Sequence, residues 1–177
     1  MDSEKLQKYR NGDADTFNAI MDEYQQPIYY YIIRMVGDQT DAEDLTQETF
    51  VKAYTEREKF RGDASIKTWL YRIASNLAKN HLRWRSVRNF LSLDNQYPVL
   101  STTDESEEFD TPAREKELLG YLQSLSPRQR SVFILKYFNG LSHKEIGRIL
   151  GISEGSSRTN FHYAVNSLKE QITGEES

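Results

Sequence analysis

The sequence LSHKEIGRILGISEGSSRTNFHYAVNSL, residues 141–168, has the pattern of two helices joined by a tight turn. Ser142 and Glu145 form a capping box at the start of the first helix. Gly151 is suited to the positive φ that a tight turn between helices needs. An amphipathic second helix follows over about 154–171. This pattern predicts a helix-turn-helix.

The outward face of this second helix is polar. Phe161, Val165 and Leu168 occupy the inner side, so the hydrogen-bonding side chains lie opposite, at Arg158, Thr159, His162 and Tyr163. Such side chains suit base edges and phosphates in a major groove. Ser157 stands near the turn, where this motif usually has an apolar residue. A helical hairpin without a DNA role is the structural alternative.

The segment upstream of this motif divides into a helix and a linker. Ser126 and Gln129, with Pro127 between them, form a strong helix start, and that helix is expected to end near 139–140. Before it, residues 94–112 lose helical periodicity, and residues 101–110 carry five acids and no base. Such a composition buries too little apolar area to offset its ordering entropy, so we expect an extended acidic linker.

The N-terminal half is also helical. Apolar residues recur at helical spacing from Phe17 to Met35, and Pro27 is expected to kink or split that helix. Thr40 and Glu43 form a plausible capping box for the next helix. A loop at 60–65 precedes a long helix over about 66–85.

The long helix has one basic face. Its apolar stripe includes Trp69 and Trp84, for which core packing is a better expectation than base stacking. The opposite face carries Arg72, Ser75, Asn76, Lys79 and Arg83. Cations follow phosphates, and an asparagine can hydrogen-bond an unpaired base edge. The alternative interpretation of such a run of charges is a solvent-exposed helix face with no binding role.

Composition excludes several classes of protein. The 177 residues include no cysteine, which excludes disulfides, zinc–thiolate sites, iron–sulfur clusters and thiol catalysis. The three histidines lack metal-ligand spacing, and no phosphate-binding glycine motif is present. We therefore expect no enzyme activity, no metal and no cofactor. The N-terminus has no apolar signal segment and no apolar run is long enough to span a membrane, so we expect a cytoplasmic protein.

Charge is strongly segregated along the chain. The net charge is −7 over residues 1–50, +7 over 52–88, −6 over 89–117 and +2 over 118–177. Two basic blocks separated by an acidic one indicate two surfaces that face a polyanion.

These residues resemble the bacterial extracytoplasmic-function sigma factors, two-domain members of the primary-type sigma family. The resemblance is carried by DAEDLTQETF at 41–50, by FRGD at 60–63 with TWLYRIASNLAKN at 68–80, by LSPRQR at 125–130 with FILKYF at 133–138, and by 141–168. The stretches follow family order and spacing. Where many members have basic residues this chain has Asn160, Tyr163 and Val165, and Ser156–Ser157 replaces the commoner Thr–Val.

The resemblance implies roles for particular residues. It implies a face that docks on the clamp helices of core RNA polymerase, formed by Asp41, Asp44, Gln47, Glu48 and Val51. It implies that the first domain melts the downstream (−10) promoter element and contacts DNA through Arg61, Lys67, Arg72, Asn76, Lys79, Asn80 and Arg83, with Asn76 beside a flipped base. The helix-turn-helix would read the upstream (−35) element through Arg158, Thr159, His162 and Tyr163.

The expected architecture is therefore all-α, with two small helical domains at 1–92 and 118–177 joined by an acidic flexible linker at 93–117. The expected function is that of an alternative sigma factor that initiates transcription, with core RNA polymerase, promoter DNA and an anti-sigma factor as partners and without insertion into a membrane. An autonomous helix-turn-helix regulator, which would footprint a palindrome by itself, is the alternative. A helical adaptor that binds only protein is disfavoured by the basic face of 66–85.

Overall fold

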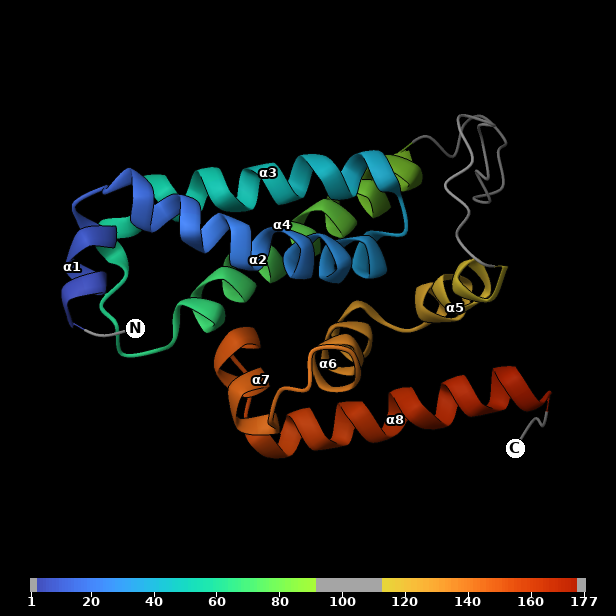
Figure 1. Cartoon of the computed structure of the whole chain (residues 1–177). Helices are drawn as coiled ribbons and strands as arrows, with labels where there is room; N and C mark the ends of the chain where they lie inside the picture. Colours follow the sequence, from blue (N-terminus) through green and yellow to red (C-terminus); the bar gives the residue numbers. More distant parts are fainter. Residues whose placement is uncertain (1–2, 92–112, 175–177) are drawn as a thin grey trace.

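The chain forms two helical units that pack side by side (Figure 1). The computed structural model describes residues 3–91 and 113–174, and every regular element in those ranges is helical. The first unit comprises α1 (Ser3–Arg10), α2 (Ala14–Val36), α3 (Gln39–Thr55), the short 3-10 helix η1 (Arg57–Lys59) and α4 (Ile66–Leu91). The second comprises α5 (Ala113–Ser124), α6 (Pro127–Tyr137), α7 (His143–Leu150) and α8 (Glu154–Thr173).

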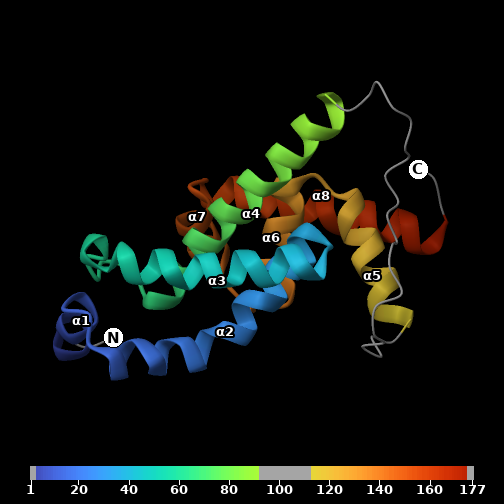
Figure 2. The ribbon, with the colours of Figure 1, turned by 90° about the horizontal axis from the view of Figure 1, so that it is seen from above.

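Helix α2 runs through its internal proline without a break. Asp13 caps its start by accepting a hydrogen bond from the Thr16 N–H at 2.9 Å, and Gly37 ends it with a φ of 75°. Pro27 lies inside the helix, which changes direction along its length in Figure 2 but stays one element. The expectation of a kink thus holds, and the chain does not split into two helices here.

Helix α3 begins earlier than the sequence pattern predicts. Its N-cap is Asp38, whose carboxylate accepts a hydrogen bond from the Asp41 N–H at 2.8 Å. The capping box predicted for Thr40 and Glu43 is therefore wrong. The physical reason is that Asp38 directly follows the Gly37 that ends α2, and an aspartate at that point is itself a good cap.

The second unit largely follows its sequence signals. Both predicted capping boxes are present, at the starts of α6 and α7, and Gly151 has a φ of 66° in the turn before α8. Two boundaries differ. Helix α5 begins at Ala113, inside the range predicted as linker, and α4 extends past Arg85 to Leu91. The segment predicted as linker otherwise lies outside the described residues.

The C-terminal end of α2 is where the two units join. The last carbonyl groups of a helix have no partner inside the helix and need external donors. Here Gln123 of α5 donates to the Arg34 carbonyl at 3.1 Å, and Arg130 of α6 donates to that of Met35. Arg85 of α4 donates to the Val36 carbonyl at 3.4 Å. Helices from both units therefore end up around one helix terminus.

A buried tyrosine hydroxyl makes a second connection between the units. Tyr31 on α2 is fully buried, and its hydroxyl lies 2.8 Å from the Ser75 hydroxyl on α4 and 2.7 Å from the Ser131 hydroxyl on α6. A buried hydroxyl without partners would be costly, so these two serines stabilise the arrangement of all three helices. Burial raises the pKa of Tyr31, which keeps the hydroxyl neutral.

No helix among residues 3–91 and 113–174 is long and apolar enough to cross a bilayer. In the same ranges, no three His, Cys, Asp or Glu side chains are grouped so that they could hold a metal ion.

Gly147 of α7 is expected to be intolerant of a side chain. A Cβ placed there would meet the Ile152 carbonyl oxygen at 2.6 Å, which is backbone and cannot swing away. We predict that Gly147→Ala destabilises the second unit by about 1–3 kcal/mol, as overpacking does elsewhere. Loss of helical circular dichroism in a urea titration measures the effect.

Gly120→Ala is the matched control for this prediction. Gly120 lies inside α5, and a Cβ there meets nothing within 4 Å. The control should be neutral or stabilising by about 0.5–1 kcal/mol, because alanine is the better helix former. Equal urea midpoints for Gly147→Ala and wild type would show that the turn adjusts without cost.

Candidate nucleic-acid interface

Helix α4 carries the basic face that the sequence predicts. Its 26 residues include six lysines and arginines and no acidic residue. Asn76, Lys79 and Arg83 are exposed on one side, with Asn80 beside them, and Arg72 is half-buried on the same side. Ser75 is buried, because it bonds Tyr31, so it is not available on that face. Such a row of cations around an amide suits a phosphate backbone with a base edge.

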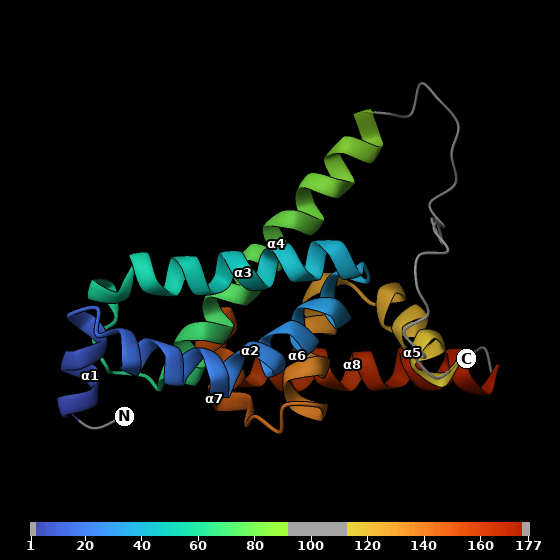
Figure 3. The ribbon, with the colours of Figure 1, turned by 45° about the horizontal axis from the view of Figure 1, so that its top comes forward.

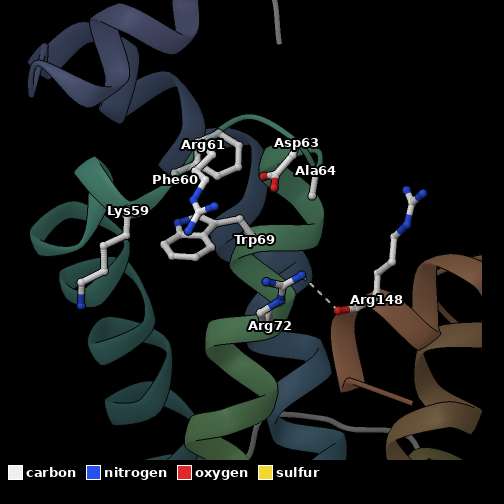
Figure 4. A pocket seen from close by; sticks show the side chains of 8 residues that line it. All are labelled: Lys59, Phe60, Arg61, Asp63, Ala64, Trp69, Arg72 and Arg148. Carbon is white, nitrogen blue, oxygen red and sulfur yellow. Dashed lines mark hydrogen bonds between the residues drawn. The ribbon is translucent and has the colours of Figure 1, made fainter. Parts of the chain in front are cut away.

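A polar pocket lies at the N-terminal end of α4 (Figure 4). It has a volume of about 510 Å³, and its charged lining consists of four cations, Lys59, Arg61, Arg72 and Arg148, and one carboxylate, Asp63. Phe60 and Trp69 form an aromatic wall, with ring centroids 5.7 Å apart. Cations around an aromatic surface match the chemistry of a nucleotide. Two residues predicted to bind DNA, Arg61 and Arg72, meet here.

The second unit closes over part of this face. Arg72 donates a hydrogen bond to the main-chain carbonyl of Arg148 on α7 at 3.1 Å. Farther along α4, the side chains of Asn76, Lys79 and Arg83 line a cleft of about 540 Å³ whose other wall includes Arg128. In this arrangement, the basic face of α4 borders α6 and α7, and Asn76, Lys79 and Arg83 remain exposed in the cleft. Lys67 is half-buried near the start of α4 and does not line the cleft.

Arg130 holds the second unit in that position. Besides the Met35 carbonyl, its guanidinium donates to the Gln123 side chain and to the main-chain carbonyls of Gln123 at 2.8 Å and Leu125 at 3.1 Å. Burial, with Arg85 nearby, lowers the pKa of Arg130 to about 10, so it stays charged at neutral pH. A buried cation requires such acceptors, and among residues 3–91 and 113–174 no carboxylate forms an ion pair with Arg130.

The polar face of α8 points away from the rest of the second unit. Arg158, Thr159, His162 and Tyr163 are all exposed. Arg158 pairs with Glu154 one turn earlier, and His162 Nε2 lies 3.1 Å from the Asn166 amide nitrogen. The face is therefore accessible even while the two units are packed together. Ile172, in the last turns of the helix, is exposed.

Ser157, unusual for its position, is buried and has a polar partner. It is fully buried between α7 and α8, and its hydroxyl lies 2.9 Å from His143 Nδ1. The His143 ring also packs edge-on against Phe161, with centroids 5.8 Å apart. Burial, followed by the charges of Lys136 and Arg158, lowers the pKa of His143 below its ordinary value. The neutral imidazole and the serine thus form one polar contact inside the turn.

In the structure, only part of the predicted docking face on α3 points outward. Asp44, Gln47, Glu48 and Val51 are exposed along one side of the helix. Asp41 is turned toward α4, where its Oδ2 lies 2.9 Å from His81 Nε2. Glu48 lies 3.8 Å from Lys52, a long contact that leaves it available to a partner.

Two surface features differ from what the sequence predicts. Beside Val51, a groove of about 410 Å³ runs between α2 and α3 and is lined by Phe17, Met21, Phe50 and Tyr54 among others. The expectation that Trp84 packs in the core is wrong: its side chain is 67 % exposed. The apolar stripe predicted for α4 faces the core as far as Leu77. Beyond that point α4 extends past the helices that could cover it (Figure 3).

Comparison with known protein families gives matches in both units. Residues 20–87 match the family described as sigma-70 region 2, and residues 115–168 match sigma-70 region 4. The chain is 31 % identical to the ECF RNA polymerase sigma factor SigW of Bacillus subtilis, over 97 % of each chain. It is 35 % identical to the RNA polymerase sigma factor YlaC of the same organism, over 94 % of this chain and 95 % of that one.

Solved structures share the fold. CnrH, in a complex with the cytosolic domain of CnrY, superposes with a TM-score of 0.75 at 19 % identity, over 97 % of each chain. The sigma factor RpoE of Bartonella quintana, in a complex with the anti-sigma factor NepR, superposes with a TM-score of 0.73 at 22 % identity, over 90 % of this chain and 98 % of that one.

His143 should make the stability of the second unit depend on pH. Because its folded-state pKa is lowered, the folded protein binds fewer protons there than the unfolded chain does. The stability that His143 contributes is fully present above the pKa of the unfolded chain, about 6.5. It is lost as the pH falls through the lowered pKa of the folded protein. We predict that His143→Gln reduces the loss of thermal stability between about pH 7 and about pH 5.5.

Ser157→Ala is the control for this experiment, since it removes the hydroxyl and keeps the imidazole, and should retain a pH dependence. Thermal unfolding followed by circular dichroism across the pH range gives the comparison. If His143→Gln and wild type lose stability in parallel, the titration of another group dominates.

Proposed function

The chain belongs to the extracytoplasmic-function sigma factors of the sigma-70 family, and on this premise we propose that its two units read the two elements of a promoter. As a member of this family, it is an alternative sigma factor that directs RNA polymerase to promoters, and it is not an enzyme. The first unit reads and melts the downstream element, and the helix-turn-helix of the second reads the upstream element.

The observation that carries the downstream assignment is the charge of α4. Helix α4 carries six cations and no carboxylate, and Asn76 lies among the cations. The pocket that includes residues of the 60–64 loop lies at the start of this helix. Asn76 takes the role of reading an unpaired base, because a short amide can hydrogen-bond a base edge. Arg61, Lys67, Arg72, Lys79, Asn80 and Arg83 contact the backbone around it. The range 1–92 acts as one domain in this scheme, and 118–177 as the other.

The upstream assignment rests on the exposed face of α8. Arg158 is the side chain best suited to a bidentate contact with guanine, and Thr159, His162 and Tyr163 complete the face. Few cations lie on this helix, so affinity for the upstream element depends more on hydrogen bonds and apolar contacts than on phosphate neutralisation.

Core RNA polymerase docks on α3 in this proposal. The curated relatives are named as RNA polymerase sigma factors, and α3 presents Asp44, Gln47, Glu48 and Val51 outward. An acidic face with one apolar anchor suits the basic surface of a helical clamp. Asp41 contributes less than the sequence suggests, since His81 already engages it.

The packing of the two units has a consequence for promoter binding. Asn76, Lys79 and Arg83 line a cleft against the second unit and are exposed there, whereas Arg72 is half-buried and donates to the Arg148 carbonyl, so a DNA strand that follows the whole basic face engages Arg72 only after this contact opens. The solved relatives are complexes with CnrY and with the anti-sigma factor NepR, and we infer that an anti-sigma factor also binds this chain. The cytoplasm, where promoter DNA lies, is the proposed location.

The docking face can be tested by charge reversal. Asp44→Arg with Glu48→Arg should weaken binding of core polymerase by several kcal/mol, because two cations then face a basic partner. The thermal midpoint should stay near that of wild type, since both side chains are exposed. Affinity is measured by titrating labelled core polymerase with each variant.

The matched control reverses two exposed acids on the second unit, Glu117→Arg with Glu170→Arg, and so makes the same change in net charge. This control should bind core polymerase like wild type. Equal affinities for the α3 variant and the control would move the docking site elsewhere.

The base-reading role of Asn76 predicts a change in specificity rather than in overall affinity. In assembled holoenzyme, Asn76→Ala should relax discrimination at one promoter position by about 1–3 kcal/mol. Lys79→Ala should instead weaken all promoters alike and lower the salt slope by about one unit. Competition between promoter variants across a salt series separates the two effects. Unchanged base preference in Asn76→Ala would exclude it as the reading residue.

A further inference from the structure

The cleft between the two units is lined by side chains from four helices. Met35 of α2, Leu82 and Val87 of α4 and Leu150 of α7 supply apolar surface to its walls. Its volume of about 540 Å³ lies within the range of roughly 300–1,000 Å³ that small-molecule sites occupy. Such sites form preferentially where two domains meet. The size and the place of the cleft therefore suit a small ligand that contacts both units.

Three cations in this cleft lack an anionic partner. Lys79 and Arg83 lie one turn apart on α4, and Arg128 lies in the first turn of α6 on the other wall. All three are exposed, and within residues 3–91 and 113–174 none of them forms an ion pair with a carboxylate. The positive end of the α6 dipole adds to their potential. The cleft therefore favours a ligand with a negative charge.

The combination of cations and apolar walls narrows the chemistry of the ligand further. The described residues that line the cleft include no aspartate or glutamate, so an anionic head meets no repulsion from them. A head between Lys79 and Arg128 accepts charge-assisted hydrogen bonds from both units. An apolar body against Leu82 and Leu150 removes apolar surface from water, which inorganic phosphate alone does not do. The best match is thus an amphiphilic anion.

We propose that this cleft binds a small anionic ligand with an apolar body, such as a medium-chain carboxylate, and that the bound ligand holds the two units together. A ligand that contacts both units has a higher affinity for the packed arrangement than for the separated one, so it shifts the population toward packing. One consequence rests on the proposed function. The ligand occupies Lys79, to which we assign a DNA contact, and therefore opposes promoter binding.

Calorimetric titration of the full chain with dodecanoate tests the site, because this probe has a carboxylate head and an apolar chain. Acetate has the same head without the chain, and dodecyltrimethylammonium has the same chain with the opposite charge. We expect saturable binding of dodecanoate and binding of both control probes that is weaker by about ten-fold or more, the scale of one lost charge-assisted contact. Equal binding of dodecanoate and dodecyltrimethylammonium would overturn the proposal, since the cations would then play no part.

Variants on the two walls test whether the ligand bridges the units. Arg128→Ala on α6 and Lys79→Ala on α4 should each weaken dodecanoate binding by about ten-fold, since each removes one contact with the head. Both side chains are exposed, so neither change should disturb the fold, which circular dichroism checks. If Lys79→Ala weakens binding and Arg128→Ala does not, the ligand lies on α4 alone and the bridge is wrong.

Arg10→Ala is the matched control for these variants. Arg10 is an exposed arginine on α1 that lines a different pocket, so its removal changes the net charge of the chain equally but leaves the cleft intact. This variant should bind dodecanoate like wild type. Equal weakening by Arg10→Ala and Arg128→Ala would show that the probe responds to overall charge rather than to the cleft.

An amphiphilic anion can be free in solution or part of a lipid bilayer, and we assign the free form. The apolar walls lie between the units, where a headgroup in a bilayer cannot bring its chains. The full chain should therefore bind dodecanoate and should not float with phosphatidylglycerol vesicles. Flotation that Arg128→Ala abolishes would replace the free ligand with a lipid headgroup and overturn the proposal.

A promoter experiment separates this inference from the proposed function. Dodecanoate added before core polymerase should reduce binding of a forked promoter by wild type but not by Arg128→Ala. If dodecanoate binds and fork binding by wild type does not fall, the ligand does not favour the packed arrangement and that part of the proposal is wrong. If Lys79→Ala binds the fork like wild type, the assignment of α4 to DNA fails, whereas the calorimetric result, obtained without DNA, stands.

Discussion

The carbonyl groups at the C-terminal end of α2 must find donors, and that need organises the molecule. The Gly37 N–H donates a hydrogen bond to the Ile33 carbonyl at 2.8 Å. The next three carbonyls take their donors from α5, α6 and α4. The negative end of the α2 dipole favours the two arginines among these donors. One helix terminus thus fixes where the second unit sits and, through it, which face of α4 is covered.

The same geometry divides the two candidate DNA surfaces. The face of α4 is shared with the second unit through Arg72 and Arg148, whereas the polar face of α8 stays exposed. The candidate surface on α8 is therefore fully exposed, whereas the candidate surface on α4 is partly covered at Arg72. Ser131, which bonds the Tyr31 hydroxyl, and Asn139, which donates to the Tyr71 hydroxyl at 2.8 Å, add to the contact between the two units.

Local signals in the sequence predicted local structure well. The capping boxes at Ser126 and Ser142 and the turn at Gly151 depend on neighbouring residues only, and all three are confirmed. One local signal failed, the Thr40–Glu43 capping box, which the neighbouring Asp38 replaces. The other errors arose where a distant element decides. The exposure of Trp84 depends on which helices reach the end of α4, and the turn of Asp41 toward α4 depends on where His81 lies. Periodicity gives the side of a helix but not what covers it.

Both units belong to one chain, and this has a consequence for the packed arrangement. Association between two separate proteins weakens on dilution, whereas association between tethered parts depends on their effective concentration, which the connecting segment sets. The fraction of molecules in the packed form is therefore the same whether the cell holds few copies or many. A ligand shifts that fraction only if its affinities for the packed and separated forms differ. The abundance of the protein and the fraction in the packed form are therefore controlled independently.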